Sequence, residues 1–178
     1  MIAFHRSAVV LLIATLAGCA SQVTRPPDAA TAREPIRTLM SFEVEISPAC
    51  KAAMADAETQ KFDPAALRAV IQRTLDGAKL LAPDGEFKMT VTIDQVRVRG
   101  TFNAIMFGFM AGADQLDGTA TLTRLDNRPA GDFKITTSYA LGGFVGGTDS
   151  TRVGWLYEEF AKVLTTELVA RRDRPASP

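Results

Sequence analysis

Residues 87–98 read Phe-Lys-Met-Thr-Val-Thr-Ile-Asp-Gln-Val-Arg-Val, and this stretch decides the predicted fold. Apolar side chains occupy every second position from Phe87 to Ile93, which is the period of a strand with one buried face. The alternation changes parity at Asp94-Gln95 and resumes at Val96, as it does where a strand carries a β-bulge. A strand of this kind needs a second layer of structure to cover its apolar face.

The chain on both sides of this strand predicts its neighbours in a sheet. Downstream, residues 116–125 and 132–141 read as the two arms of a hairpin, joined by Asn-Arg-Pro-Ala-Gly at 127–131. Upstream, residues 39–46 alternate apolar and polar side chains until Pro48 ends the pattern. The central strand and the two arms therefore form an antiparallel meander.

Two amphipathic helices are predicted to cover one face of this sheet. The first has an N-cap and a proline at its first helical position in Asp63-Pro64, and Gly77 suits its C-terminal cap. The second runs over about 151–171, and Asp149 or Ser150 can cap it. The apolar stripes consist of Leu67, Val70, Ile71 and Leu75 in the first helix and of Val153, Leu156, Phe160, Val163, Leu164 and Leu168 in the second.

The predicted fold class is α+β: a two-layer domain with a mostly antiparallel sheet in β-α-β-β-β-α order and two amphipathic helices on one face. Residues 49–61 are rich in alanine and fit either a short helix or a loop. We expect a single domain over residues 37–171, followed by a disordered tail over residues 172–178.

The N-terminal residues carry the pattern of a bacterial lipoprotein signal. A basic start precedes the apolar run 8–16, which is too short to cross a bilayer. Leu16-Ala17-Gly18-Cys19 then reads as a lipobox, with cleavage before Cys19 and acyl chains, palmitate among them, on its sulfur and on the new amino terminus. We expect residues 1–18 to be a signal peptide and residues 19–36 to be an acylated cysteine followed by a flexible tether.

The expected location is the periplasmic face of the outer membrane. Several acyl chains hold a protein stably on a bilayer, whereas one chain binds only marginally. Ala20 stands at position two of the mature chain, and in the sorting pattern that this resembles it favours the outer over the inner membrane. The alternatives to lipoprotein processing are ordinary secretory cleavage near Ala20 and an uncleaved anchor.

Composition argues against several classes of function. The chain has 20 basic and 20 acidic residues, so no excess of positive charge points to nucleic acid. Its one histidine, His5, lies in the predicted leader, which excludes imidazole-dependent catalysis and histidine zinc sites from the mature chain. We expect no enzyme activity, no cofactor and no metal.

Cysteine and carboxylate chemistry is the remaining route to an enzyme. Cys50 is left without a partner once Cys19 is acylated, and a shielded thiol is favoured over an intermolecular disulfide. Most acidic residues sit at expected turns or strand ends, where solvated structural roles are favoured. These residues are Asp84, Glu86, Asp94, Asp114, Asp117, Asp126, Asp132 and Asp149.

Two uncharged, glycine-rich segments are the best candidates for a binding site. Residues 102–112 contain three Phe, two Met and one Ile, and residues 141–147 read Leu-Gly-Gly-Phe-Val-Gly-Gly. In an antiparallel meander both segments leave the same end of the sheet. There they either form an exposed apolar surface that binds a protein or a lipid, or they fold over the end of the core and are buried. The candidate binding residues are Phe107, Gly108, Phe109, Gly112, Gly142, Gly143, Phe144, Gly146 and Gly147.

These segments also carry a resemblance. The run 106–113, a strand pair with Asp126 at its turn, the Gly-Gly-x-x-Gly-Gly stretch 142–147 and the closing helix resemble an uncharacterised family of Gram-negative lipoproteins, a domain of unknown function. The likeness covers roughly residues 90–170, and the chain departs from the family at the turn and at Met110. The family implies no activity and no catalytic residues.

The expected function is therefore that of an outer-membrane-anchored periplasmic lipoprotein with a non-enzymatic domain that binds a protein of the envelope or assists envelope assembly. The element order is also similar to periplasmic domains of envelope-assembly and curli-secretion lipoproteins, which is an analogy of fold only. The alternative is that a lipid or a small apolar ligand binds between the two glycine-rich segments.

Overall fold

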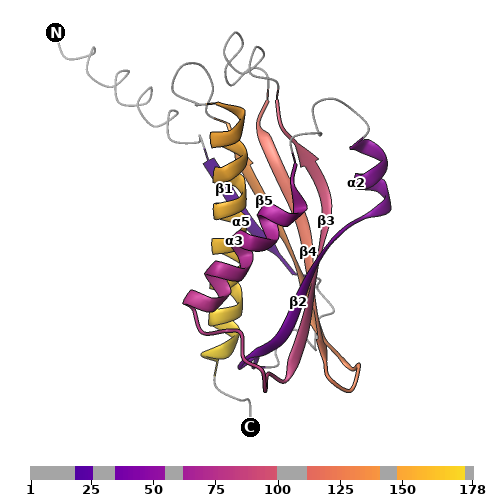
Figure 1. The fold of residues 1–178 in the computed structure, drawn as a ribbon, viewed down its shortest axis with the longest axis vertical. Coiled ribbons are helices and arrows are strands. Elements are labelled where there is room, and N and C mark those ends of the chain that lie inside the picture. The colour runs from indigo at the N-terminus through magenta and orange to yellow at the C-terminus, as the bar shows by residue number, and fades with distance from the viewer. Residues whose placement is uncertain (1–18, 26–34, 55–61, 100–111, 141–147, 175–178) are drawn as a thin grey trace, which may run out of the picture.

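A five-stranded sheet forms one layer of the protein, and two helices form the other (Figure 1). The computed structural model describes residues 19–25, 35–54, 62–99, 112–140 and 148–174. The predicted α+β class, with a mostly antiparallel sheet in a two-layer arrangement, is confirmed.

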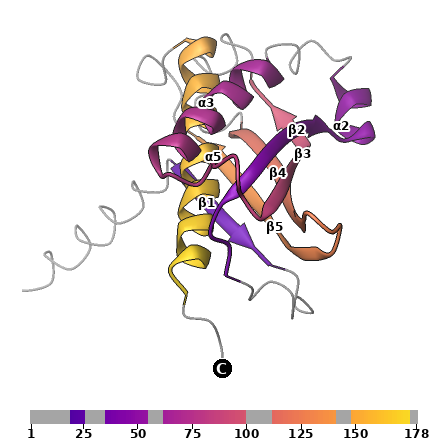
Figure 2. The same ribbon diagram turned by 60° about the horizontal axis from the view of Figure 1, so that its bottom comes forward.

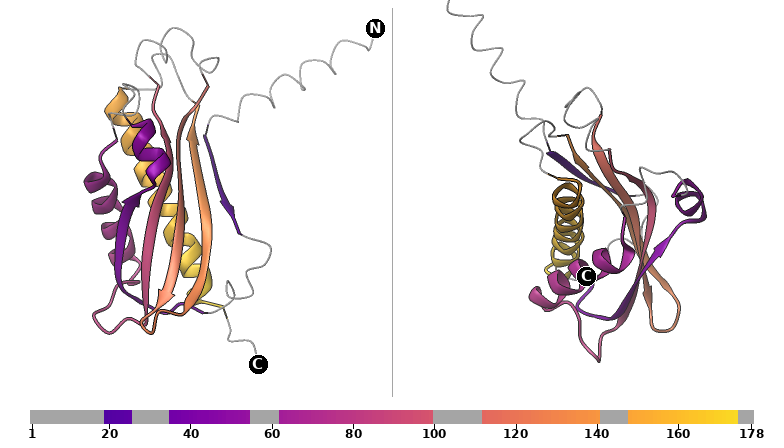
Figure 3. Two further views of the ribbon diagram at one scale, coloured as in Figure 1. Left: turned by 90° about the vertical axis from the view of Figure 1, so that its right-hand side faces the viewer. Right: turned by 45° about the horizontal axis from the view of Figure 1, so that its top comes forward.

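The sheet has the strand order β1-β5-β4-β3-β2. Strand β2 runs parallel to β3, and every other neighbouring pair is antiparallel. The elements are β1 (Cys19–Thr24), β2 (Leu39–Ile46), α2 (Pro48–Ala53), α3 (Pro64–Gly77), β3 (Phe87–Arg97), β4 (Asp114–Arg124), β5 (Pro129–Tyr139) and α5 (Asp149–Arg172). Helices α3 and α5 lie on the same side of the sheet (Figure 3).

Strand β3 follows the predicted pattern closely. Phe87, Met89, Val91 and Ile93 are buried beneath the helices, and the residues between them face the other side of the sheet. The pairing with β4 shifts between Ile93 and Gln95, which confirms the β-bulge expected from the change of parity.

Helix α3 begins as the sequence predicts. The Asp63 carboxylate accepts hydrogen bonds from the backbone N–H groups of Ala65 at 2.9 Å and Ala66 at 3.3 Å, which satisfies two donors of the first turn. The prediction for its end is wrong, because Gly77 is still helical and Ala78 takes the cap position. Lys79 then adopts a positive φ of 56° and turns the chain toward the sheet.

Helix α5 is capped by Thr148, so the predicted caps Asp149 and Ser150 are wrong. The Thr148 hydroxyl accepts from the N–H of Thr151 at 3.4 Å. Asp149 is engaged instead by Arg152, whose Nη2 lies 2.7 Å from its Oδ1. The predicted apolar stripe is confirmed. Val153, Leu156, Phe160, Leu164 and Leu168 are buried, and Val163 is partly buried.

The beginning of the predicted tether is a strand, which corrects the sequence-based expectation. All six residues of β1 pair with β5, from Cys19 opposite Tyr139 to Thr24 opposite Lys134. Without β1 the backbone groups on the outer edge of β5 would be unpaired, and edge strands tend to recruit another strand. At the other end of the expected tether, Ile36 is fully buried in the core, which is a second correction. Residues 26–34 lie outside the described residues.

Of the two alternatives for residues 49–61, the helix is correct for the part that the structure describes. Helix α2 is capped by Ser47, whose hydroxyl accepts from the N–H of Cys50 at 3.2 Å, and it lies apart from α3 and α5 (Figure 2). Cys50 is 3% exposed, and burial raises the pKa of its thiol. The shielded thiol expected from the sequence is thus confirmed.

The start of β2 is held by the loop that leads into β3. The Leu39 N–H donates to the Leu80 carbonyl at 2.7 Å, and the Ala82 N–H donates to the Leu39 carbonyl at 3.0 Å. Gly85 lies against the same backbone: a Cβ at this position would be 2.3 Å from both the Leu39 carbonyl carbon and the Met40 nitrogen. Only glycine fits this approach.

The predicted hairpin is confirmed, with β4 and β5 as its arms. Asn127 adopts a φ of 65° in the turn, and the Asp126 carboxylate accepts from the Arg128 N–H at 3.1 Å. That hydrogen bond, helped by one from the Arg128 side chain, lowers the pKa of Asp126. Strand β5 begins at Pro129, earlier than expected, because the strand pairing extends almost to the turn.

At the C-terminus, α5 ends at Arg172. Residues 175–178, the last part of the predicted disordered tail, lie outside the described residues. Among the helices of the described ranges, none combines the length and apolar character needed to cross a membrane.

Candidate functional site

The residues that flank the two glycine-rich segments meet at one end of the sheet, as the meander predicted. Asp114, where the chain enters β4, pairs with Tyr139, where it leaves β5. Arg97, at the end of β3, pairs with Gln115 of β4. Helix α5 also begins at this end (Figure 1).

Of the predicted binding residues, Gly112 is the one that the structure describes. Its φ is +85°, and a Cβ there would lie 3.3 Å from the guanidinium of Arg97, so the backbone geometry requires glycine. The others, Phe107, Gly108, Phe109, Gly142, Gly143, Phe144, Gly146 and Gly147, lie outside the described residues.

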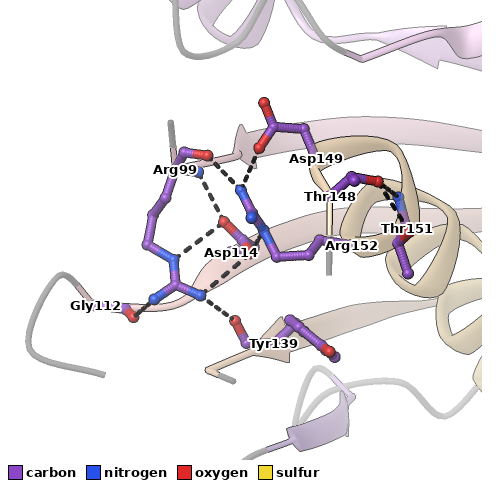
Figure 4. Close-up of polar contacts among 8 residues, drawn as sticks. All are labelled: Arg99, Gly112, Asp114, Tyr139, Thr148, Asp149, Thr151 and Arg152. Carbon is purple, nitrogen blue, oxygen red and sulfur yellow. Dashed lines mark hydrogen bonds and ion pairs between the residues drawn. The ribbon is translucent and has the colours of Figure 1, made fainter. Parts of the chain in front are cut away.

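A buried cluster of charged side chains holds this end of the sheet together (Figure 4). Arg99, Asp114 and Arg152 are 2%, 0% and 1% exposed. The Asp114 carboxylate accepts from the backbone N–H of Arg99 at 2.7 Å and from its Nε at 3.2 Å. Its other oxygen accepts from Nε of Arg152 at 2.8 Å. One carboxylate therefore joins the end of β3 to the start of α5.

The same arginines donate to backbone carbonyls at the ends of both glycine-rich segments. Arg99 donates through Nη1 to the Gly112 carbonyl at 2.6 Å and through Nη2 to the Tyr139 carbonyl at 3.1 Å. Arg152 donates through Nη2 to the Arg99 carbonyl at 2.6 Å (Figure 4). These hydrogen bonds fix four places in the chain relative to one another: the end of β3, the start of β4, the end of β5 and the start of α5.

The cluster balances its charges within the fold. Arg99 and Arg152 face Asp114, and Asp149 is a second carboxylate that pairs with Arg152 at 2.7 Å. Buried charges are tolerated where they are paired and hydrogen-bonded, as they are here.

Sequence reasoning missed this cluster. It did not single out Arg99 or Arg152, and it assigned Asp114 a solvated role, which is wrong because the side chain is fully buried. Asp117 is also buried, at 5% exposure, with Lys134 Nζ 3.6 Å from its carboxylate. One signal was available: Arg152 lies four positions before Leu156, on the apolar stripe of α5.

Aromatic side chains flank the cluster. The rings of Tyr139 and Trp155 are tilted by 50°, with centroids 4.9 Å apart. Tyr139 is buried, whereas Trp155 is partly exposed. Because Cys19 pairs with Tyr139, the backbone of the predicted lipidation residue lies at this same end of the sheet.

A groove of about 500 Å³ lies between the N-terminal ends of α3 and α5. Its surface is mainly apolar, and Gly154 opens onto it, since a Cβ there would have no neighbouring atom within 4 Å. The lining residues are Asp63, Ala66, Asp149, Ser150, Val153, Gly154 and Tyr157. The groove adjoins the start of α5 and so lies beside the buried cluster.

Tyr157, which lines this groove, makes the protein less stable at strongly alkaline pH. Burial raises its pKa to about 12, while its hydroxyl accepts a hydrogen bond from the Asp63 N–H at 2.7 Å. In the unfolded chain the pKa is about 10. The stabilisation from neutral Tyr157 is therefore complete below pH 10 and declines as the pH rises toward 12.

Replacing Tyr157 by Phe is expected to remove this part of the pH dependence. Urea unfolding of both proteins, measured in steps from about pH 9 to about pH 12, would show a shallower decline for Tyr157→Phe. Parallel declines in the two proteins would contradict the assignment.

No group of three or more histidine, cysteine, aspartate or glutamate side chains within the described ranges is arranged to hold a metal ion.

No protein-family model and no curated protein matches this chain. Among solved structures, the chain is similar to the dodecamer of a PelC single-residue variant from Paraburkholderia phytofirmans, at 14% identity and a TM-score of 0.46, over 84% of this chain and 98% of that one. A PelC dodecamer from the same organism, in another crystal form, gives 12% identity and a TM-score of 0.40, over 80% and 94% of the two chains. No conclusion about function follows from similarity at this level.

Proposed function

We propose that this chain is a lipoprotein, anchored to the periplasmic face of the outer membrane through Cys19, whose domain binds a protein of the envelope without catalysing a reaction. The binding site consists of the two glycine-rich segments, 102–112 and 141–147. The observation that carries the proposal is the buried cluster around Asp114, which fixes the residues flanking both segments at one end of the sheet.

The chemistry of the segments supports protein binding. Phe107, Phe109 and Phe144 supply large apolar side chains of the kind that anchor interfaces, and the surrounding glycines allow a partner's backbone to approach closely. Fixing the residues that flank a binding segment reduces the entropy lost when a partner binds it. The hydrogen bonds from Arg99 to the carbonyls of Gly112 and Tyr139 hold the chain where it leaves the first segment and where it enters the second.

Site-specific photo-crosslinking in living cells tests the site. A photoreactive side chain at position 107 or 144 is expected to give a discrete adduct with one partner. The same side chain at position 125 is the control, because Leu125 is 44% exposed at the β4–β5 turn, at the opposite end of the sheet. Phe107→Ala combined with Phe144→Ala should abolish the adduct formed from position 109 while leaving the circular dichroism unchanged. Equal crosslinking from all positions would contradict the proposed site.

The anchor has a separate test. The mass of the N-terminal peptide should correspond to a chain that begins at acylated Cys19, and Cys19→Ser should abolish labelling by a palmitate analogue. An unacylated mature protein that still carries residues 1–18 would contradict the lipoprotein assignment.

A second candidate function, binding of a lipid or a small apolar ligand, is favoured by the groove beside α5. Gly154 leaves open space there, and Ala66 and Val153 supply apolar walls. Mass spectrometry of protein purified under non-denaturing conditions should then show a co-purified ligand, and Gly154→Leu should displace it. A ligand-free spectrum for the unsubstituted protein would argue against this function.

A further inference from the structure

We propose that the end of the domain where Cys19, Arg97 and Trp155 lie is a membrane-contact surface that rests directly on a phospholipid layer. This proposal rests on the acylation of Cys19 proposed above. It goes further, because a flexible tether would let the domain take any orientation on the membrane, whereas β1 holds the domain in one orientation.

The first step is that β1 is firmly part of the domain. Each of its six residues pairs with β5, and the Ser138 hydroxyl donates to the Ala20 carbonyl at 3.2 Å. The Ser21 hydroxyl also donates to the Glu159 carboxylate of α5 at 3.0 Å. The strand is therefore held by both layers of the fold.

The far end of β1 is held by a shared carboxylate. Nε of Arg25 donates to Oε1 of Glu167 at 3.1 Å, and Nε of Arg171 donates to the same oxygen at 3.3 Å. Glu167 is 6% exposed and Arg171 is 1% exposed, so Arg25 reaches into a largely buried pair. Release of β1 would leave Glu167 with one cationic partner fewer in a poorly solvated place.

The second step concerns distance. Neighbouring strands lie about 4.8 Å apart, so the Cys19 backbone is about 5 Å from Tyr139 and about 10 Å from Asp114. The headgroup region on each side of a bilayer is roughly 5–8 Å thick. Acyl chains that enter the membrane from Cys19 therefore bring the end of β5, and the start of β4 beside it, to the level of the headgroups.

The third step is that the chemistry of this surface suits that depth. Tryptophan concentrates at membrane–water interfaces, and the partly exposed Trp155 of α5 packs against Tyr139, the residue that pairs with Cys19. Arg97 is exposed at the end of β3, where a cation can approach lipid phosphate.

The opposite end of the sheet has a different character. The β4–β5 turn carries the exposed ion pair of Asp126 and Arg128, with Glu86 and Arg124 beside it. Anionic headgroups attract arginine and lysine, so the carboxylates of Asp126 and Glu86 gain nothing from contact with them. The two ends of the sheet therefore differ in the way that a membrane-facing and a solvent-facing end should differ.

Trp155 is the only tryptophan of the chain and reports directly on this surface. The acylated protein is reconstituted into vesicles of phosphatidylethanolamine and phosphatidylglycerol, and quenching by aqueous iodide and by brominated lipid is measured. We expect iodide quenching of Trp155 to be severalfold weaker than in the unacylated Cys19→Ser protein, and brominated lipid to quench it.

The matched control moves the probe to the other end of the sheet. In Leu125→Trp combined with Trp155→Phe, the single tryptophan lies at the β4–β5 turn, and iodide should reach it equally well with and without vesicles. Quenching by brominated lipid that is equal for the two probes would overturn the proposed orientation.

The outcomes also separate this inference from the proposed function. Acylated, vesicle-bound protein whose Trp155 stays as open to iodide as in the Cys19→Ser protein would overturn the contact surface and leave the anchor intact. Absence of acyl chains on Cys19 would overturn both.

Discussion

Asp114→Asn is expected to lower the free energy of unfolding by about 3–5 kcal/mol, because it leaves buried guanidinium groups without their shared counter-charge. The amide has nearly the shape of the carboxylate, but it carries no charge and presents donors where Arg99 and Arg152 already donate. Neither arginine can reach water, since each is about 98% buried or more. Urea unfolding followed by circular dichroism measures the change.

Two comparisons make the Asp114 prediction specific. Glu158→Gln removes one side of the exposed Arg73–Glu158 ion pair, and it should cost less than about 1 kcal/mol. Replacing all three members together, as Arg99→Met, Asp114→Leu and Arg152→Met, should recover part of the loss, because apolar side chains need no counter-charge. If Asp114→Asn lowered the free energy of unfolding no more than Glu158→Gln does, the buried cluster would not be what stabilises this end of the sheet.

Gly85→Ala is expected to destabilise the protein by about 3 kcal/mol, because the added methyl group would overlap the backbone of β2. Its Cβ would lie 2.3 Å from the Leu39 carbonyl carbon and 2.3 Å from the Met40 nitrogen, closer than atoms can approach without bonding. Relief requires the start of β2 to move, which breaks the hydrogen bonds between Leu39 and residues 80–82. The midpoint of urea unfolding measures the effect.

Gly154→Ala is the matched control for Gly85→Ala. Gly154 lies within α5, and a Cβ there meets no atom within 4 Å. The same chemical change should therefore stabilise the protein by about 0.5–1 kcal/mol, the usual gain from replacing a helical glycine by alanine. A similar loss from both substitutions would indicate that the close approach at Gly85 is not the cause.

Local signals in the sequence account for most of the predicted fold. The alternation in residues 87–98 identified β3 together with its bulge, since the exposed and buried faces of a strand are read at period two. Asp63-Pro64 identified the start of α3, because capping depends on the residues at the helix end alone. The meander then placed the flanks of both glycine-rich segments at one end of the sheet.

The features that were missed depend on residues distant in sequence. Residues 19–24, Cys-Ala-Ser-Gln-Val-Thr, show no clear alternation, and they form a strand because β5 offers a free edge. The role of Asp114 depends on Arg99 and Arg152, which lie on two other elements. A carboxylate at the start of a strand looks the same in sequence whether it faces water or two arginines.

The pairing of β1 with β5 has a consequence for the order of folding. The hydrogen-bonded residues Ala20 and Ser138 lie 118 positions apart, so the first strand has no partner until most of the chain has been synthesised. Strands β2 to β5 can form their own ladders before that, because β1 adds only at the edge. Closing so long a loop is entropically unfavourable and slow, and the nascent domain carries an open β5 edge in the meantime. Strand β1 can therefore take its native place only after β5, more than 100 residues further along the chain, has formed.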